Sequence, residues 1–490
     1  MKAMKNKPNI IFILSDDQGA WALECAGNYD IKTPNLNELA ERGIRFDEFY
    51  CTSPVCSPAR ASIVTGKIPS CHGIKDWIAK GNVDSIKYPE MNMLPEGMQE
   101  DFPIDYLQGN KTYMEILAEN GYRCALSGKW HLGDNVKKKK GFDKWCSLGR
   151  GGCHYYMADI FEKEKLNISK RYVTDLITEK ALEYLDDLSE KQEPFYLSVH
   201  YTAPHSPWEK KEHPEEYRAL YENCKFQATP QQAIHKNQIN TCPVGDTPEK
   251  RREYLQGYYA AITAMDSGIG KIIEKVKNKG IEQETIIIFT SDNGMNMGHH
   301  GIWGKGNGTY PPNMYDSSIK VPFIIYVPNN QYGGMVCHNK ASQYDIFPTI
   351  LELADCTYEQ EEKQPGRSIV ELIEKPDVKA SDRIVVYDEY GETRMIKKNQ
   401  YKYIQRKGNE PCEFYNLEND PEEEYNLYKD GKYSEIIKNM EKELEEWFAE
   451  YSLTYMEKQK EKITGRGQID FCFKENAFNQ DMKFYVKNSI

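Results

Sequence analysis

A cysteine followed closely by a proline and an arginine is the part of this chain best suited to chemistry. The string Cys56-Ser57-Pro58-Ala59-Arg60 places a thiol, a helix-starting proline and a fixed cation within five residues. Proline suits the first turn of a helix and Gly66 suits a left-handed end, so we expect Cys56 at a helix N-terminus. Unsatisfied N–H groups there favour a developing oxyanion or an anionic substrate. The alternative is a buried, inert cysteine.

Two acidic clusters each follow a strongly apolar segment. Ser15-Asp16-Asp17-Gln18-Gly19 comes after residues 9–14, and Ser291-Asp292-Asn293-Gly294 comes after residues 285–290. In an open α/β sheet, ligands bind beyond the carboxyl ends of strands, so we expect both clusters along one edge. Two carboxylates about 4 Å apart repel by roughly 4 kcal/mol at an effective dielectric of 20, so three crowded carboxylates require a cation.

The donor types in these clusters indicate which cation. Carboxylate and amide oxygens suit a hard divalent ion, and we predict Ca²⁺ in preference to Mg²⁺. For either cluster alone, a turn or a helix cap is the alternative interpretation.

The order of apolar and amphipathic segments indicates the fold class. Continuous apolar runs predict buried strands at residues 9–14, 195–199, 285–290 and 321–327. Helical patterns cover residues 111–120, 171–188 and 254–279. This alternation predicts an α/β domain over residues 1–375, with a large, mainly parallel central sheet flanked by helices.

The pattern changes beyond about Glu374. Short strands are expected at residues 383–387, 393–396 and 401–404, followed by a charged helix over residues 433–451. We therefore predict a small C-terminal domain of antiparallel sheet and helix over residues 376–455. Residues 456–490 have no clear period and are predicted to form an arm over the surface or over a partner subunit.

Composition narrows the functional classes. The net charge of −12 over 490 residues argues against a nucleic-acid-binding surface, so an anionic substrate would need a local cationic pocket. No segment is long enough to cross a membrane. The 13 cysteines lack the spacing of a disulfide framework, and residues 10–14 are too short for a signal peptide. A reduced, cytoplasmic setting is the expectation.

The extended string from Cys56 to Lys67 resembles the signature of type I sulfatases, the formylglycine-dependent enzymes of the alkaline-phosphatase-like superfamily. Cys51 lacks the proline two positions on, so the nucleophile is assigned to Cys56. Lys67 departs from the family, in which arginine is commoner. Further segments similar to the family's are Asp16-Asp17, Gly128-Lys129-Trp130-His131-Leu132-Gly133, Ala203-Pro204-His205-Ser206-Pro207, Asp292-Asn293, Trp303-Gly304-Lys305-Gly306 and the stretch 413–421.

The resemblance implies a mechanism and a partner. Cys56 would be oxidised to formylglycine by a formylglycine-generating or anaerobic maturation enzyme. The hydrated aldehyde, oriented by Arg60, would attack sulfur, and His131 would deprotonate its second hydroxyl to release sulfate. His205 or His300 would protonate the leaving alcohol. Lys129 and Lys305 would hold the sulfate oxygens, whose developing charge fixed cations stabilise. The implied metal ligands are Asp16, Asp17, Cys56, Asp292 and Asn293.

The predicted function is hydrolysis of a sulfate monoester, a carbohydrate sulfate in preference to an aryl or steroid sulfate. One alternative is a phosphonate monoester or phosphodiester hydrolase of the same superfamily. The other is a non-catalytic sulfate or glycan binder in which Cys56 remains a thiol. Groups that contact the leaving portion are expected in the loops 76–109, 149–160 and 208–247.

Overall fold

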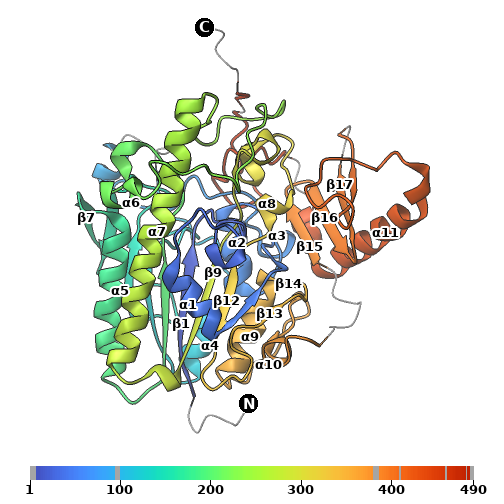
Figure 1. Ribbon diagram of the computed structural model, residues 1–490. Helices are drawn as coiled ribbons and strands as arrows, with labels where there is room; N and C mark the ends of the chain where they lie inside the picture. Colours follow the sequence, from blue (N-terminus) through green and yellow to red (C-terminus); the bar gives the residue numbers. More distant parts are fainter. Residues whose placement is uncertain are drawn as a thin grey trace.

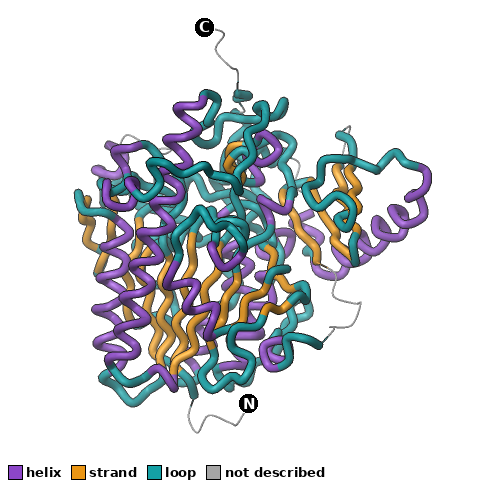
Figure 2. Tube along the Cα trace, viewed as in Figure 1, coloured by secondary structure: helices purple, strands orange, loops and turns teal. Residues whose placement is uncertain are grey.

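A ten-stranded sheet forms the centre of the molecule (Figures 1 and 2). The computed structural model describes residues 7–93, 100–378, 386–407, 410–457, 461–481 and 483–485. The strands lie in the order β13 (Val336–Cys337), β2 (Ile44–Phe46), β12 (Phe323–Tyr326), β9 (Thr285–Ser291), β1 (Asn9–Ser15), β8 (Phe195–His200), β4 (Arg123–Gly128), β5 (Lys144–Leu148), β6 (Ala158–Glu162) and β7 (Lys165–Ser169).

The middle of this sheet is parallel and its flanks are mostly antiparallel. β9, β1, β8, β4 and β5 run parallel to one another. β12 runs antiparallel to β9 and β2, and β6 runs antiparallel to β5 and β7. The predicted mainly parallel sheet is therefore confirmed.

Helices cover both faces of the sheet. α1 (Pro34–Arg42), α5 (Val173–Ser189) and α7 (Pro248–Asn278) pack together on one face, seen at the left in Figure 1. α2 (Cys56–Thr65), α4 (Tyr113–Glu119) and α9 (Ile346–Leu353) pack together on the other. β1 contributes alternate residues to two apolar clusters, Phe12 to one and Ile13 to the other. Coverage of both faces explains why this strand is apolar without interruption.

α7 begins six residues before the predicted start at residue 254. The Thr247 side chain accepts a hydrogen bond from the N–H of Lys250, and Pro248 occupies the first helical position. These capping interactions, and not an apolar stripe, start the helix.

Short elements complete the body. They are α3 (Pro69–His72), α6 (Glu215–Ala219), α8 (Asp316–Ile319), α10 (Val370–Glu374), α12 (Thr454–Glu457), β3 (Phe49–Tyr50), β10 (Asn296–Met297), β11 (Trp303–Gly304) and β14 (Ala341–Ser342).

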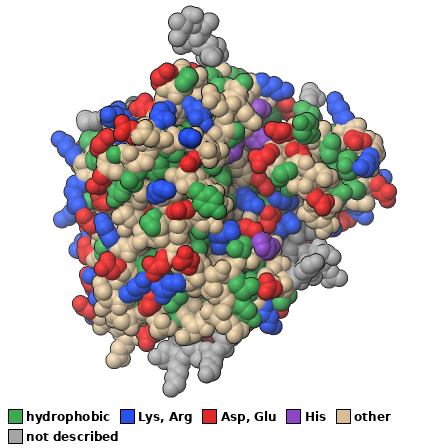
Figure 3. Space-filling view, in the orientation of Figure 1, with side chains coloured by type: hydrophobic (Ala, Val, Ile, Leu, Met, Phe, Trp, Pro, Cys, Tyr) green, Lys and Arg blue, Asp and Glu red, His purple; other side chains and the backbone are tan. Residues whose placement is uncertain are grey.

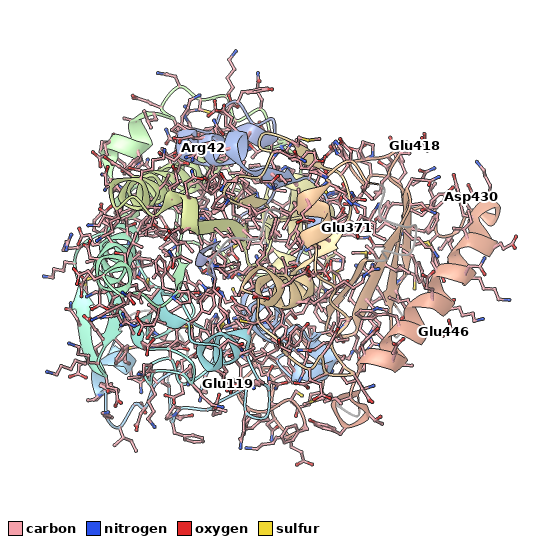
Figure 4. The ribbon with its side chains drawn as sticks, turned by 90° about the horizontal axis from the view of Figure 1, so that it is seen from below. Arg42, Glu119, Glu371, Glu418, Asp430 and Glu446 are labelled. Carbon is pink, nitrogen blue, oxygen red and sulfur yellow. The ribbon has the colours of Figure 1, made fainter. Side chains whose placement is uncertain are left out.

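A separate four-stranded antiparallel sheet follows near the C-terminus. Its strands are β15 (Val386–Tyr390), β16 (Thr393–Lys398), β17 (Tyr401–Arg406) and β18 (Glu413–Asn416). α11 (Ser434–Tyr451) packs on it through an apolar cluster that contains Leu444 and Phe414. The sheet lies between α11 and the body in Figures 1 and 4, and Figure 4 labels Asp430 just before α11 and Glu446 on it.

The predicted small domain of antiparallel sheet and helix is thus confirmed in its architecture. Residues 383–385 of the first expected strand lie outside the described residues, and the boundaries at residues 375 and 455 stay predictions. Residues 464–468 of the expected arm pack on the chain's own body, where the N–H of Gln468 donates to the carbonyl of Trp77 at 2.7 Å.

Acidic and basic side chains are interspersed over the face shown in Figure 3. Among the described residues, no helix combines the length and the apolar character needed to span a membrane.

Candidate active site

The predicted site residues lie at the carboxyl edge of the parallel strands. Asp16 follows β1, Lys129 follows β4 and Asp292 follows β9. The strand register pairs Leu14 with His200 and Ser15 with Ser291, so these strands end at the same level. Because neighbouring strands end side by side, the residues that follow them meet in one cluster although they lie far apart along the chain.

Cys56 lies at the start of α2, as predicted. Val55 is extended, the helix begins at Cys56, and Gly66 ends it in the left-handed region with φ of 68°. The Cys56 Sγ lies 2.7 Å from the Nζ of Lys305. Sγ, an Asp16 carboxylate oxygen and a ring nitrogen of His205 lie within 4.8 Å of one another. The Cys51 thiol instead lies 3.9 Å from the carbonyl of Ser318.

Three carboxylates and three cations form a buried cluster. Oxygens of Asp16, Asp17 and Asp292 lie within 4.8 Å of one another. Each carboxylate has its own cationic partner. The pairs are Lys129 Nζ with Asp16 Oδ2 at 2.5 Å, Lys305 Nζ with Asp17 Oδ1 at 2.5 Å, and Arg60 Nε with Asp292 Oδ2 at 2.8 Å.

Two oxygens of this cluster lack a hydrogen-bond partner, and the cation paired with Asp16 Oδ1, Arg60 Nη2, lies 3.9 Å away. Asp16 Oδ1 and Asn293 Oδ1 are buried and accept no hydrogen bond from any described residue. The Asn293 amide nitrogen donates to Asp17 Oδ1 at 2.9 Å, which leaves the amide oxygen as the available acceptor. Buried oxygens are normally satisfied, so these two mark a place for a ligand. An all-oxygen donor set of this kind fits a hard divalent cation.

The ionisation of the carboxylates also fits a missing positive charge. Burial and the neighbouring Asp292 raise the pKa of Asp16 to about 8. Burial opposes ionisation of Asp292 and Asp17 as well, but Arg60 lowers the pKa of Asp292 and Lys305 lowers that of Asp17. The three cations thus leave the pKa of Asp16 above its usual range, and a further cation beside Asp16 would lower it.

His131 and His205 are both neutral, and they differ in which ring nitrogen is free of a hydrogen bond to a backbone carbonyl. Burial and Lys129 hold the pKa of His131 well below its usual range, and burial lowers that of His205 to about 4. His131 Nε2 lies 2.9 Å from the carbonyl of Ile78, so Nε2 carries the proton and Nδ1 is left without a partner. His205 Nδ1 donates to the carbonyl of Ser206 at 2.7 Å, and its Nε2 lies 3.7 Å from Asp17 Oδ2.

His300 is a correction to the sequence prediction. Its ring stacks on Tyr315 with centroids 3.7 Å apart, and it does not line the cavity that contains Cys56. His300 lies in the short turn at residues 299–301 with φ of 55°, where the stacking on Tyr315 fixes its ring. Of the two histidines proposed to act on the leaving group, only His205 lies at the site.

A cavity of about 380 Å³ opens above the cluster. Cys56, Asp17 and Lys305 line it together with His131 and His205. All three loops expected to contact the leaving portion contribute to its walls. Wall residues that sequence reasoning did not single out include Trp77, Asn82, Glu100, Arg150, Glu209, Thr241, Asn307 and Arg466.

Two aromatic residues in the loops expected to contact the leaving portion, Tyr155 and Trp208, support the loop that carries His205. Tyr155 and Trp208 are fully buried. The Tyr155 hydroxyl donates to the carbonyl of His205 at 2.8 Å, and Trp208 Nε1 donates to that of Pro204 at 2.8 Å. They position the loop that carries His205 and do not contact the cavity.

The ionisation of Cys56 gives a testable expectation for protein in which this residue is an unmodified thiol. Burial raises its pKa to about 11, so only about 10⁻⁴ of the thiol is ionised at pH 7. We expect alkylation by iodoacetamide to accelerate about tenfold per pH unit between pH 7 and 9. Mass spectrometry of the peptide bearing residue 56 gives the rate. A rate that is already constant from pH 7 would contradict this ionisation.

Comparisons with known proteins agree with this geometry. Residues 8–356 match the family model described as Sulfatase, and residues 298–450 match the one described as N-sulphoglucosamine sulphohydrolase, C-terminal. The N-acetylglucosamine-6-O-sulfatase of Bacteroides thetaiotaomicron is 26% identical over 92% of this chain and 88% of its own. The ulvan-active sulfatase of Formosa agariphila is 29% identical, over 91% of this chain and 81% of its own.

Solved structures share the fold. One, of a protein in complex with its substrate D-glucosamine-2-N,6-O-disulfate, has a TM-score of 0.74 and 25% identity, and the match covers 91% of this chain and 98% of that one. The phosphonate monoester hydrolase of Agrobacterium radiobacter has a TM-score of 0.69 at 20% identity over 92% and 97% of the two chains, a similarity of fold alone.

Proposed function

The chain belongs to the sulfatase family and is therefore a sulfuric ester hydrolase, and we propose that its substrates are sulfate esters of carbohydrates. The observation that carries this proposal is the contact of Lys305 with both Cys56 and Asp17 at the floor of a cavity of about 380 Å³. The cavity walls include the polar side chains of Asn82, Thr241 and Asn307, which can form hydrogen bonds with sugar hydroxyl groups. The named relatives that act on sulfated sugars support the same substrate class.

We propose that Cys56 is converted to formylglycine by a separate maturation enzyme. A thiol with a pKa of about 11 is almost fully protonated at neutral pH and is a poor nucleophile. The aldehyde, once hydrated, supplies a hydroxyl nucleophile at the same position. The helix N-terminus and Lys305 surround that position with positive charge, which favours the approach of a sulfate group.

Asp16, Asp17, Asp292 and Asn293 would hold the divalent cation together with residue 56, and Ca²⁺ is preferred to Mg²⁺. The unpartnered oxygens of Asp16 and Asn293 support this assignment. When bound, the cation supplies positive charge beside the nucleophile and the sulfate oxygens.

The remaining polar groups have separate roles in the proposal. Lys129 and Lys305 are fixed by their carboxylate partners and stabilise negative charge that spreads over the sulfate oxygens. Arg60 holds Asp292 through Nε and the Lys129 carbonyl through Nη1 at 2.8 Å, so it positions both groups.

The two histidines would move protons. His131 has an unpartnered Nδ1 that can accept a proton from the hydroxyl at residue 56. His205 must gain a proton at Nε2 before it donates to the leaving oxygen. Asp17, at 3.7 Å, and the anionic sulfate both favour that protonated form.

A substrate screen with fully matured protein tests the proposal. The panel holds sulfated monosaccharides of defined regiochemistry, 4-nitrophenyl sulfate and an aryl phosphonate monoester. We expect kcat/KM on the best sulfated sugar to exceed that on 4-nitrophenyl sulfate by at least about tenfold, because hydroxyl groups gain partners in the cavity walls. Faster turnover of the aryl sulfate, or of the phosphonate ester, would contradict the carbohydrate assignment.

A further inference from the structure

A segment near the C-terminus forms part of the active-site wall. Gly465 and Arg466 line the same cavity as Cys56 and Lys305. Both lie beyond the matched family regions, which end at residues 356 and 450. The predicted arm is therefore a component of the site, and its own residues are available to select the substrate.

Backbone hydrogen bonds attach this segment to the loop that follows α3. The N–H of Gln468 donates to the carbonyl of Trp77 at 2.7 Å, and the N–H of Ala79 donates to the carbonyl of Gln468 at 2.8 Å. The Gln468 side chain is fully buried, and its Oε1 accepts from the N–H of Lys75 at 2.9 Å. These bonds form an isolated parallel β-bridge between Gln468 and Ile78.

The same loop touches the catalytic groups. The N–H of Ile78 donates to Ser57 Oγ at 3.0 Å, next to Cys56, and its carbonyl accepts from His131. The loop at residues 77–79 therefore lies between the C-terminal segment and the nucleophile position and forms hydrogen bonds with both sides. These hydrogen bonds hold the C-terminal segment close to the place where the sulfate would react.

Two glycines allow this close approach. Gly465 and Gly467 have φ of 79° and 105°, in the region that favours glycine. A Cβ at residue 467 would lie 2.5 Å from the Cβ of Ala79, and one at residue 465 would lie 2.7 Å from that of Asn307. Any side chain at these positions would displace the segment. Arg466, between them, is the residue whose side chain is available to the cavity.

The Arg466 guanidinium is held in place but is not neutralised. Nη1 donates to the carbonyl of Asn240 at 2.8 Å and Nε donates to that of Asp481 at 3.1 Å. Within the described part of the chain, no carboxylate forms an ion pair with it. By contrast, Arg150 on the same cavity has Asp159 Oδ2 at 3.4 Å from its Nε. Arg466 therefore adds a positioned, uncompensated positive charge to the cavity wall.

We propose that Arg466 is a specificity-determining residue that binds a second anionic group of the glycan, a sulfate or a carboxylate, in addition to the sulfate ester that is hydrolysed. The inference rests on the proposed carbohydrate sulfatase function. A guanidinium whose orientation is fixed by two carbonyls can present its remaining N–H groups to two oxygens of one anion. Trp77, on the same wall, donates through Nε1 to the carbonyl of Gly465 at 3.0 Å and offers an aromatic surface to a sugar ring.

Direct binding tests the assignment without turnover. In protein carrying Cys56→Ala, calorimetry would compare N-acetylglucosamine 6-sulfate with two dianionic probes. These are glucosamine 2-N,6-O-disulfate and a disaccharide of N-acetylglucosamine 6-sulfate with a uronic acid. We expect Arg466→Gln to lower the affinity for at least one dianionic probe by about tenfold or more. The affinity for the monoanionic probe should fall by no more than about threefold. The probe affected identifies the second group as sulfate or carboxylate.

Matched variants separate recognition from folding. Arg466→Lys keeps the charge and is expected to recover part of the lost affinity. Lys474→Gln removes an exposed charge from the same arm and should leave the affinity for both the monoanionic and the dianionic probes unchanged. Equal losses on all three probes, or no loss on any, would overturn the assignment.

The proposed function is tested separately. If the matured wild-type enzyme leaves every sulfated sugar intact while dianionic probes bind in an Arg466-dependent way, the function fails and the assignment stands. If the matured enzyme desulfates sulfated sugars but its preference for dianionic probes does not depend on Arg466, the function stands and the assignment of Arg466 fails.

Discussion

Replacement of Cys56 by alanine is expected to lower kcat/KM on a sulfated sugar by at least about 10⁴-fold, because it removes the precursor of the nucleophile. The cations and the cavity would remain, so the affinity for substrate should change by less than about tenfold. Steady-state kinetics with matured wild-type and variant proteins would measure the first effect, and calorimetry the second.

Cys51→Ala is the matched control, since it removes a buried thiol five residues away that does not line the cavity. It should retain activity within about threefold. Mass spectrometry of the peptide bearing residue 56 completes the experiment. In active protein we expect the sulfur and two hydrogens of Cys56 to be exchanged for one oxygen. Full activity in protein whose residue 56 is entirely thiol would contradict the proposed role.

Removal of the cation site is expected to have an effect nearly as large. Asp292→Asn eliminates a carboxylate that also anchors Arg60, so kcat/KM should fall by at least about 10²- to 10³-fold. Ca²⁺ at 100 times its Kd should stabilise the wild-type protein by about 2.7 kcal/mol, because the ion binds the folded state alone. Thermal unfolding with and without Ca²⁺ would show a raised Tm for wild type and a much smaller rise for the variant.

Asp186→Asn provides the control for this experiment. Its partly exposed carboxylate forms ion pairs with Lys275 and Lys279 and belongs neither to the carboxylate cluster nor to the cavity lining. We expect the variant to keep both its activity and its response to Ca²⁺. An equal rise of Tm in Asp292→Asn and in wild type would place the bound ion elsewhere. A larger rise with Mg²⁺ than with Ca²⁺ would reverse the proposed choice of metal.

Local sequence rules were sufficient for the elements that carry the site. Apolar runs that end in Asp16-Asp17 and Asp292-Asn293 predicted two parallel strands with ligands at their carboxyl ends, and both lie next to each other in the sheet. Pro58 and Gly66 predicted where the Cys56 helix starts and ends. These features depend on periodicity, capping and turn conformation over a few residues, and such short-range effects can be read from the chain.

Other features could not be predicted because they depend on contacts between distant segments. His131 and His300 each follow a glycine, Gly128 and Gly298, by a few residues and both have positive φ, yet only His131 lines the cavity. A loop side chain takes its direction from the partners packed around it, here Ile78 for His131 and Tyr315 for His300. No local pattern encodes those partners.

The sequence by itself determined four strands of the central sheet, the nucleophile helix, the acidic clusters and the family resemblance. Only the tertiary structure decided that Asp16 and Asn293 each keep an unpartnered oxygen, that His300 is absent from the site, and that Arg466 belongs to it. Arg466 lies 410 positions after Cys56, and the hydrogen bonds between the backbones of Gln468 and residues 77–79 that hold its segment at the cavity join parts of the chain far apart in sequence. Helix and strand signals act over a few residues, whereas the composition of a cavity depends on which distant segments the whole chain packs together.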